Sequence, residues 1–490
     1  FENADCLANK LGLGKDNPAR LRAAIFHAVN QASAPRPKEA LLAMLENRLG
    51  FSASHLDTAL IEEIDEGFIS EVQDSLILTT LQQADRLIEK RLKALGQGPT
   101  PWPDIDTDKA LSWAQNKFDL SLSPNEYQAT QMALSSKLCV LDVAPGARKD
   151  NVLKAFLNIL KAKNVNIALT APTRSEAKKL SEETEIDVKS VSKFLEWNAK
   201  TSKYKRTVKK KLECQLLIVS APQLLDRHSL AALLDALPKE AALLLITDMK
   251  ETPPLRAGNI LNQFQNSEAV TSITLNELSS QFTQSQRLQN LHRLRQNQPV
   301  MESENTSDFY IIEANSEPDA LRKITEIVKN RLPNKFKYNP IKDIQVVCQK
   351  SAGELGANAL NRLLQEQLNP IENNSFVERF GCRYRVGDKV ILNENNLDKN
   401  LMAHEIGFIK AIDKEAQTMS IILGGKTITF HLDELDQMAL AYAIPATHAH
   451  SIDTKAVVLC VDDMSSQQKI IYNTASKPEE LFALLHIGKL

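Results

Sequence analysis

Short, continuous apolar runs separated by helix-like segments dominate the chain from residue 118 onward. The apolar runs before residue 250 are Leu138–Val143, Asn166–Thr170, Gln215–Ser220 and Ala242–Thr247. Strands that are buried on both faces lack polar alternation, and parallel neighbours need long crossover connections. The pattern therefore predicts an α/β domain in which helices cover a parallel sheet.

A second strand–helix region follows, with apolar strands expected at Phe309–Ile312, Ile344–Cys348 and Val457–Val461. Between the last two, Tyr384–Phe430 contains shorter runs such as RVGDKVIL and KTITFHL, separated by turn signals. Short alternating strands of this kind are typical of a small antiparallel barrel. We therefore expect a small barrel inserted into a second α/β domain.

The N-terminal part is different, because its apolar residues recur at helical spacing. A chain of 490 residues is long enough for several domains. Helices are expected at Ala4–Leu11, after Pro18, at Pro37–Leu49 and at Leu56–Asp65, followed by a hairpin at Gly67–Leu78. We divide the chain into a winged-helix-like helical module (1–95), a Pro/Gly-rich linker (96–117), a first α/β domain (118–270), a second α/β domain (271–380 and 437–490) and its insert (381–436).

Composition excludes some classes of protein and leaves others open. The net charge is −2 and aromatic residues make up 5% of the chain, so any nucleic-acid footprint must be a local basic patch. The six cysteines are scattered without a CxxC pair, which argues against zinc or iron–sulfur sites and suggests a reducing compartment. No apolar run is long enough to span a bilayer, so a cytoplasmic protein without a membrane partner is expected. The chain begins at Phe1 in what reads as a helix, so we expect residues upstream.

The turn after Val143 lies where a phosphate-binding P-loop would lie, between a buried strand and a helix. Pro145, Gly146 and Lys149 fit a Walker A loop, in which backbone N–H groups wrap phosphates and a lysine reaches the β- and γ-phosphates. Arg148 stands where a glycine belongs, and Asp150 stands where the magnesium-binding hydroxyl belongs. The loop by itself is a weak signal.

Neighbouring segments make the pattern specific, because they follow one another in the order found in one family. That family is the RecD-like superfamily 1 DNA helicases. Ala171–Leu180 (APTRSEAKKL) resembles its motif Ia, and Ser190–Trp197 resembles its next DNA-contact segment. Its motif III is resembled by Leu244–Asp248 together with Pro253 and Ala257–Leu261. Further matching stretches are Asp343–Val347, Leu360–Gln365, Arg385–Val390, Ala441–Ile444 and Ala456–Leu459. The resemblance covers essentially the whole chain. It implies tandem RecA-like P-loop domains, an SH3-like β-barrel insert and an N-terminal helix-hairpin-helix or winged-helix module.

The departures from this family fall on residues that handle magnesium, water and phosphate. In the Walker B position, Ser220 and Ala221 replace the aspartate that would organise magnesium and the glutamate that would activate water. The other departures are Lys250-Glu251 for Asp-Gln in motif III, Ser280 for the motif IV arginine, Thr447–Asp453 for the motif V/VI signature, Lys477 for the final arginine finger and Glu126 for the adenine-contacting glutamine. One missing arginine finger alone costs about 10³–10⁵ in rate. We expect hydrolysis to be weak or absent.

The resemblance also supplies candidate binding residues. The nucleotide set is Glu126, Pro145, Gly146, Ala147, Arg148, Lys149 and Asp150, and the DNA set is Pro172, Thr173, Ser190, Lys205, Arg206 and Lys209. Lys149 could bind phosphate or be a solvated lysine, and the basic run Lys203–Lys211 could line a DNA channel or be a solvated surface. His448 and His450 form an HxH pair that we interpret as incidental, and Trp197 is expected at a buried domain edge rather than stacked on a base.

Three functions remain open at this point. The leading hypothesis is a degenerate helicase that binds single-stranded DNA with little or no ATP hydrolysis and acts as a clamp, a scaffold or an inactive partner subunit. The first alternative is an active ATP-dependent 5′-to-3′ helicase in DNA repair or recombination, with ATP and Mg²⁺ as cofactors. The second is a protein-interaction scaffold that binds neither DNA nor cofactor.

Overall fold

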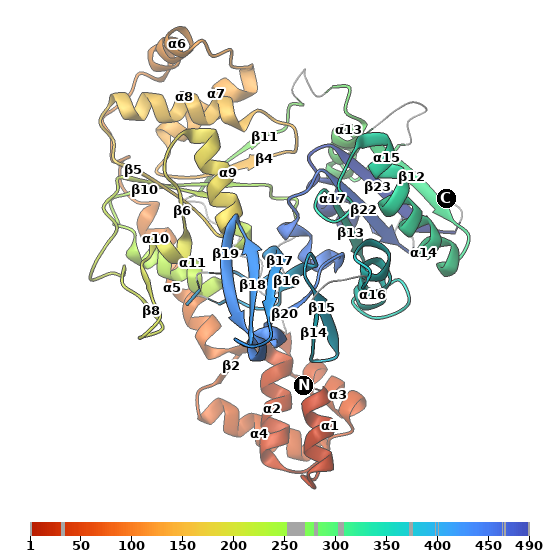
Figure 1. Cartoon of the computed structure of the whole chain (residues 1–490). Helices are drawn as coiled ribbons and strands as arrows, with labels where there is room; N and C mark the ends of the chain where they lie inside the picture. The colour runs from red at the N-terminus through yellow and green to blue at the C-terminus, as the bar shows by residue number, and fades with distance from the viewer. Residues whose placement is uncertain are drawn as a thin grey trace.

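The computed structural model of the chain describes residues 2–30, 35–251, 270–278, 283–301, 308–371, 376–396, 398–399, 401–462, 464 and 467–488. The N-terminal module packs helices against a three-stranded antiparallel sheet of order β1-β3-β2. Its elements are α1 (Glu2–Lys10), α2 (Pro18–Asn30), β1 (Arg36–Pro37), α3 (Lys38–Leu49), α4 (Ala53–Asp65), β2 (Ile69–Val72) and β3 (Ser75–Leu78). The hairpin expected at 67–78 is confirmed, and Figure 1 shows the module as a lobe at one end of the molecule.

Helix α5 (Thr79–Leu95) connects this module to the first α/β domain. The Arg91 side chain donates hydrogen bonds to the carbonyl oxygens of Leu234 and Asp235, at the end of α11 (Arg227–Ala236). The following segment is only partly a linker, because all of α6 (Thr107–Phe118) except its last residue lies inside the predicted 96–117 range. Leu111 and Ala114 of α6 are fully buried in the core of the first α/β domain. The prediction of a linker is therefore wrong for this helix. Its buried apolar residues alternate with polar residues in the sequence, so the segment did not read as a buried helix.

The first α/β domain has a six-stranded sheet of order β11-β4-β10-β9-β5-β6, and every pairing in it is parallel. Its strands are β4 (Leu138–Val143), β5 (Ile167–Ala171), β6 (Lys189–Ser190), β9 (Leu216–Ser220), β10 (Ala242–Thr247) and β11 (Thr271–Leu275). Its helices are α7 (Pro124–Ser135), α8 (Lys149–Ala162), α9 (Arg174–Thr184), α10 (Val191–Phe194) and α11, with the short 3-10 turn η1 (Pro222–Leu224) and the hairpin strands β7 (Trp197–Asn198) and β8 (Lys203–Tyr204). The predicted parallel sheet is confirmed. Strand β11 belongs to this sheet, so the sheet extends beyond the boundary that we placed at residue 270.

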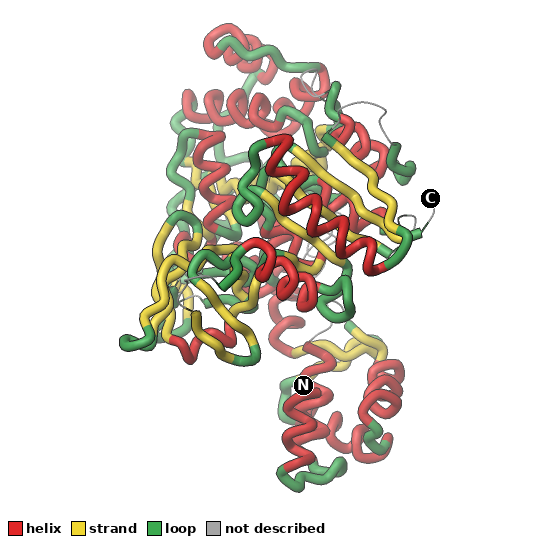
Figure 2. Tube along the Cα trace, turned by 45° about the vertical axis from the view of Figure 1, so that its right-hand side comes forward, coloured by secondary structure: helices red, strands yellow, loops and turns green. Residues whose placement is uncertain are grey.

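The second α/β domain has a five-stranded parallel sheet of order β12-β23-β22-β13-β21. Its strands are β12 (Phe309–Ala314), β13 (Ile344–Cys348), β21 (Ala443–Pro445), β22 (Ala456–Val461) and β23 (Leu481–Ile487). Its helical segments are α13 (Gln286–Arg295), α14 (Glu317–Glu326), η3 (Ile327–Arg331), α15 (Leu332–Phe336), α16 (Ala357–Leu368), η5 (Ala446–Ser451) and α17 (Gln468–Ala475). The three predicted strands are present, and β23 was missed. Figure 2 shows this sheet with helices against it.

The insert has a five-stranded antiparallel sheet of order β19-β18-β17-β16-β20, next to the hairpin β14-β15. Its elements are β14 (Phe376–Arg379), β15 (Cys382–Arg385), β16 (Lys389–Leu392), β17 (Ile406–Asp413), β18 (Thr418–Leu423), β19 (Lys426–His431), η4 (Leu432–Gln437) and β20 (Met438–Leu440). The expected small antiparallel unit is therefore present. It begins earlier and ends later than residues 381–436, because β14 and β20 pair with its strands. Figure 1 shows it below the two α/β domains, near α9.

Candidate functional site

The turn between β4 and α8 has P-loop topology, and the first α/β domain presents it to the second. Gly146 has a φ of +81°, a conformation that favours glycine. A Cβ at Gly146 would lie 2.7 Å from Cδ1 of Leu278 and 3.1 Å from Cδ1 of Leu288, a residue of α13. Apolar side chains that follow β11 in the chain therefore press directly on the turn, and only glycine leaves room for them.

The two basic residues of the turn are paired with carboxylates of their own domain. Lys149 Nζ lies 3.0 Å from Oε1 of Glu183 on α9. Arg148 Nε lies 2.9 Å from Oε1 of Glu126, which is 6% exposed. Glu126 also caps α7, where its carboxylate accepts the backbone N–H of Ser123. The residue predicted to contact adenine is thus engaged in a helix cap and an ion pair.

The remaining P-loop candidates have no phosphate-binding side chain. Pro145 offers a carbonyl oxygen, which lies 3.0 Å from Nε2 of His292. Ala147 donates its N–H to the Ala144 carbonyl at 3.1 Å. Asp150 lies half-buried in the first turn of α8, where a negative charge would repel a phosphate. At the end of β9, Ser220 is buried and Ala221 has a φ of +50°, so neither position supplies the carboxylate expected there.

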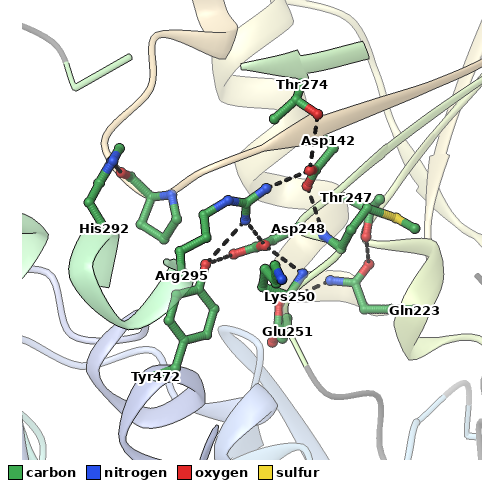
Figure 3. Close-up of polar contacts among 12 residues, drawn as sticks. Asp142, Gln223, Thr247, Asp248, Lys250, Glu251, Thr274, His292, Arg295 and Tyr472 are labelled. Carbon is green, nitrogen blue, oxygen red and sulfur yellow. Dashed lines mark hydrogen bonds and ion pairs between the residues drawn. The ribbon is translucent and has the colours of Figure 1, made fainter. Parts of the chain in front are cut away.

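Arg295 of α13 joins two carboxylates at the carboxyl ends of adjacent strands. Its guanidinium nitrogens lie 2.5 Å from Oδ2 of Asp142, on β4, and 2.5 Å from Oδ1 of Asp248, just after β10. Burial lowers the pKa of the Arg295 guanidinium, but the bond to Asp142 and the charges of both aspartates outweigh burial and raise it above its usual value. Arg295 is therefore a permanent cation between the two aspartates (Figure 3).

The same two aspartates have further partners. Tyr472 of α17 donates its hydroxyl hydrogen to Oδ2 of Asp248 at 2.5 Å. Asp142 Oδ1 accepts the backbone N–H of Met249 at 2.8 Å, and its other oxygen accepts the Thr274 hydroxyl at 3.4 Å. Figure 3 shows these groups converging from both α/β domains. Every carboxylate oxygen of the two aspartates therefore already accepts at least one hydrogen bond within the protein.

A second ion pair crosses between the domains at Lys477, which follows α17. Its ammonium contacts Oε1 of Glu251, and both side chains are mostly buried, at 17% and 10% exposed. The other Glu251 oxygen accepts the Gln223 amide at 3.0 Å, and Gln223 in turn accepts the Thr247 hydroxyl at 2.7 Å. The predicted arginine-finger position therefore holds a lysine whose charge is neutralised by the glutamate of the motif III position.

The predicted DNA-facing residues of β5 and β6 have little exposed side chain. Pro172 and Ser190 are buried, and Thr173 caps α9 by accepting the N–H of Glu176 at 3.2 Å.

The insert and the 450–454 loop lie against α9. Arg174 donates a hydrogen bond to the Lys399 carbonyl oxygen at 3.0 Å, and the Lys179 ammonium lies 3.0 Å from the Asp453 carboxylate. A cavity of about 250 Å³ remains there, lined among others by Arg174, Lys179, Lys342, Glu405 and Asp453.

The basic run lies on and after the β7–β8 hairpin and contains two kinds of residue. Arg206 is half-buried and pairs with Glu196 at 2.6 Å and Glu213 at 3.5 Å. Lys205 and Lys209 are exposed. Trp197 is half-exposed rather than buried, and its ring packs edge-on against Tyr204 with centroids 5.0 Å apart. Lys205 and Lys209 are therefore better placed than Arg206 to meet a phosphate backbone.

The HxH histidines lie together with a third histidine from the insert. His404 stacks on His448 with ring centroids 3.9 Å apart, and its Nδ1 lies 3.2 Å from Nε2 of His450. Burial, with the nearby Lys477 charge, lowers the pKa of His450 to about 3. Within the described ranges, no group of three or more His, Cys, Asp or Glu side chains is placed to hold a metal ion.

Some predicted residues cannot be compared with the structure, and some structural residues were not predicted. Ser280, Pro253 and 257–261 lie outside the described residues. Arg295, Tyr472 and Glu183 were missed, because their partners are distant in sequence and no local pattern marks them. The apolar spacing of QRLQNLHRLR was the only available signal for α13. No helix in the described part of the chain is long and apolar enough to cross a membrane.

Comparison with known proteins gives two family matches in chain order. Residues 121–315 match an AAA domain, and residues 360–422 match the SH3 domain of ATP-dependent RecD-like DNA helicases. The chain belongs to the RecD-like superfamily 1 helicases. Within that family, it is 23% identical over 475 residues to the ATP-dependent RecD2 DNA helicase of Deinococcus radiodurans, covering 94% of this chain and 64% of that protein.

A second curated relative and a solved structure were also compared with the chain. The RecBCD enzyme subunit RecD of Buchnera aphidicola is 20% identical over 424 residues, covering 71% of this chain and 69% of that protein. A crystal structure of Pif1 helicase from Bacteroides, in complex with ADP-AlF3 and ssDNA, covers 75% of this chain and 92% of its own at 14% identity and a TM-score of 0.43. This RecD-like chain thus spans about two thirds of the length of the curated relatives it matches.

Proposed function

We propose that this RecD-like protein binds single-stranded DNA with little or no ATP hydrolysis. The observation that carries the proposal is the neutralisation of every P-loop cation: Lys149 pairs with Glu183, and Arg148 pairs with Glu126. A phosphate would have to displace a carboxylate to reach either cation. Since a carboxylate held on the same protein has a high effective concentration, nucleotide binding is weakened before chemistry begins.

The magnesium ion that the family implies does not fit the residues present. Magnesium prefers a hydroxyl or carboxylate from the protein, together with waters and phosphate oxygens. The position that should carry the hydroxyl holds Asp150, and the position that should carry the carboxylate holds the buried Ser220. The two nearby aspartates, Asp142 and Asp248, are bound to the Arg295 cation. A divalent cation would have to compete with a buried guanidinium. No hydrolytic step through magnesium is therefore part of the proposal.

DNA binding is supported by the surface charges that lie apart from the nucleotide cleft. Lys205 and Lys209 are exposed beside the first α/β domain, and phosphate contacts need only positive charge and backbone donors. The cavity beside α9 places Lys342 close to Arg174, which belongs to the segment that resembles motif Ia. Loss of hydrolysis therefore does not entail loss of DNA binding. A protein partner subunit stays a prediction without a structural counterpart.

The proposal is tested by fluorescence anisotropy with a labelled single-stranded oligonucleotide over a series of salt concentrations. We expect binding at low salt, with the logarithm of the affinity falling linearly as the logarithm of the salt concentration rises. The affinity should be the same whether ATP and Mg²⁺ are present or absent. Negligible binding even at low salt would favour the interaction scaffold. Binding that changes severalfold with ATP and Mg²⁺, together with strand separation, would favour the active helicase.

A further inference from the structure

Helix α13 contacts both α/β domains. Leu291 and Leu294 are buried in the core of the second domain, together with Phe309 and Phe482. Leu288, His292 and Arg295 recur at a spacing that places them along one side of the helix, and each contacts the first domain. The helix is thus anchored in one domain and placed against the P-loop of the other.

The apolar part of this contact fills space beside the P-loop turn. Leu288 and Leu278 approach Gly146 so closely that a single added methyl group would collide with Leu278. His292 lies in hydrogen-bond contact with the carbonyl oxygen of Pro145 in the same turn. The turn is therefore held by protein side chains on the side where it faces the second domain.

The charged part joins the domains through buried groups. Arg295 binds Asp142 and Asp248, and Lys477 binds Glu251, so two cations of the second domain meet three carboxylates of the first. Tyr472 adds a hydrogen bond to Asp248. Removing one partner from such a pair leaves the other charge buried and uncompensated, so each residue here depends on its partner much more strongly than in an exposed ion pair. In P-loop motors, charge between the domains is supplied by the nucleotide phosphates and magnesium.

We propose that the face of α13 and the Tyr472–Lys477 segment form a lock that holds the two α/β domains together without nucleotide. Arg295 and Lys477 interact with protein carboxylates across the cleft, where ligand phosphates would otherwise be needed to draw the domains together. The inference rests on the proposed function in one respect, the absence of productive nucleotide binding. It goes further because it assigns the closed arrangement to named residues and predicts that nucleotide does not control it.

Hydrogen exchange monitored by mass spectrometry on the full chain tests the lock. The test variant combines Arg295→Gln with Lys477→Gln, and the matched control is Arg322→Gln, which removes an exposed arginine paired with Asp319 inside the second domain. We expect the amides of 144–149 and 286–295 to exchange at least about tenfold faster in the test variant and unchanged in the control. Unchanged exchange in the test variant would overturn the lock.

Because the double variant could unfold, Arg295→Lys serves as a second variant. A lysine keeps the charge, but its single ammonium cannot match the planar fork that reaches two carboxylates. Faster exchange confined to 144–149 and 286–295 supports the lock, and exchange identical to wild type contradicts it. Adding ATP and Mg²⁺ to the wild type separates the two proposals. Slower exchange in 144–149 with ATP hydrolysis contradicts the proposed function, whereas the effect of the variants decides the lock alone.

Discussion

The guanidinium of Arg295 lies 2.5 Å from the carboxylate of Asp142, although 153 residues separate them in the chain. Asp142 is the penultimate residue of β4, the strand that leads into the P-loop, and Arg295 lies in the last turn of a helix of the other α/β domain. A permanent cation of the protein thus lies beside the nucleotide cleft that the family topology predicts. This relationship is the basis of our proposal that the two domains are held together without nucleotide.

Removal of Arg295 should destabilise the protein more than removal of an exposed arginine. Arg295→Gln leaves Asp142 and Asp248 buried without their cation, which costs about 3–5 kcal/mol. Adding Asp248→Asn should recover about 1–3 kcal/mol of that loss, because the two residues interact directly. Urea denaturation of the single and double variants measures the coupling, with Arg322→Gln as the control expected to shift stability by less than about 0.5 kcal/mol. Additive single effects would contradict direct coupling.

Freeing Lys149 should strengthen anion binding at the P-loop. Glu183→Gln removes the carboxylate that pairs with Lys149, and a half-exposed pair of this kind contributes up to about 1 kcal/mol. We therefore expect a fluorescent ADP analogue to bind up to about fivefold more tightly to Glu183→Gln than to wild type. Glu182→Gln, which alters an exposed pair with Lys178 on the same helix, is the control. Equal affinity in all three proteins would show that Glu183 does not restrain Lys149.

Charge reversal in the basic run should reveal which residues meet DNA. Lys205→Glu combined with Lys209→Glu should weaken binding to single-stranded DNA. The slope of log affinity against log salt concentration should become less negative by about 0.7 for each phosphate contact that is lost. Lys93→Glu changes an exposed lysine on α5 and provides the control. Arg206 is unsuitable, because it is paired with Glu196 and its loss disturbs the hairpin. An unchanged salt slope in the double variant would remove this run from the DNA footprint.

Lys389 should make stability depend on pH above neutrality. Burial lowers the pKa of its ammonium to about 7, while the unfolded chain keeps the ordinary value of 10.5. Between these values the unfolded state binds the extra proton, so folding stability rises with pH by up to about 1.4 kcal/mol per unit. Lys389→Met should remove this rise and stabilise the protein at pH 7. Comparing urea midpoints of the two proteins from pH 7 to 8.5 isolates the effect, and parallel curves would contradict it.

The sequence predicted the layers of the fold better than their limits. Strands such as Leu138–Val143 are continuously apolar, so their burial in a parallel sheet follows from composition alone. Strand β11 (TSITL) alternates in polarity and lies at the edge of its sheet, so its membership depends on pairing with β4. Helix α6 was assigned to a linker because Pro and Gly residues precede it. Boundaries set by distant contacts leave little local signal.

The sequence predicted which catalytic residues the candidate site lacks, but it did not predict which side chains pair with the remaining lysines. Ser220 and Ala221 in the Walker B position follow directly from the sequence. The partners Glu183 for Lys149 and Glu251 for Lys477 are visible only when the chain is folded, because each lies far from its lysine in sequence. The pairing of these two lysines with internal carboxylates is therefore a structural result.

ATP turnover, measured with and without single-stranded DNA in the presence of Mg²⁺, tests the central claim most directly. We expect hydrolysis to stay at the background of a blank reaction, with no stimulation by DNA. Lys149→Ala should give the same background, since Lys149 is already paired with Glu183. DNA-stimulated turnover of about 1–10³ s⁻¹, the usual range for enzymes, that disappears in Lys149→Ala would contradict the account.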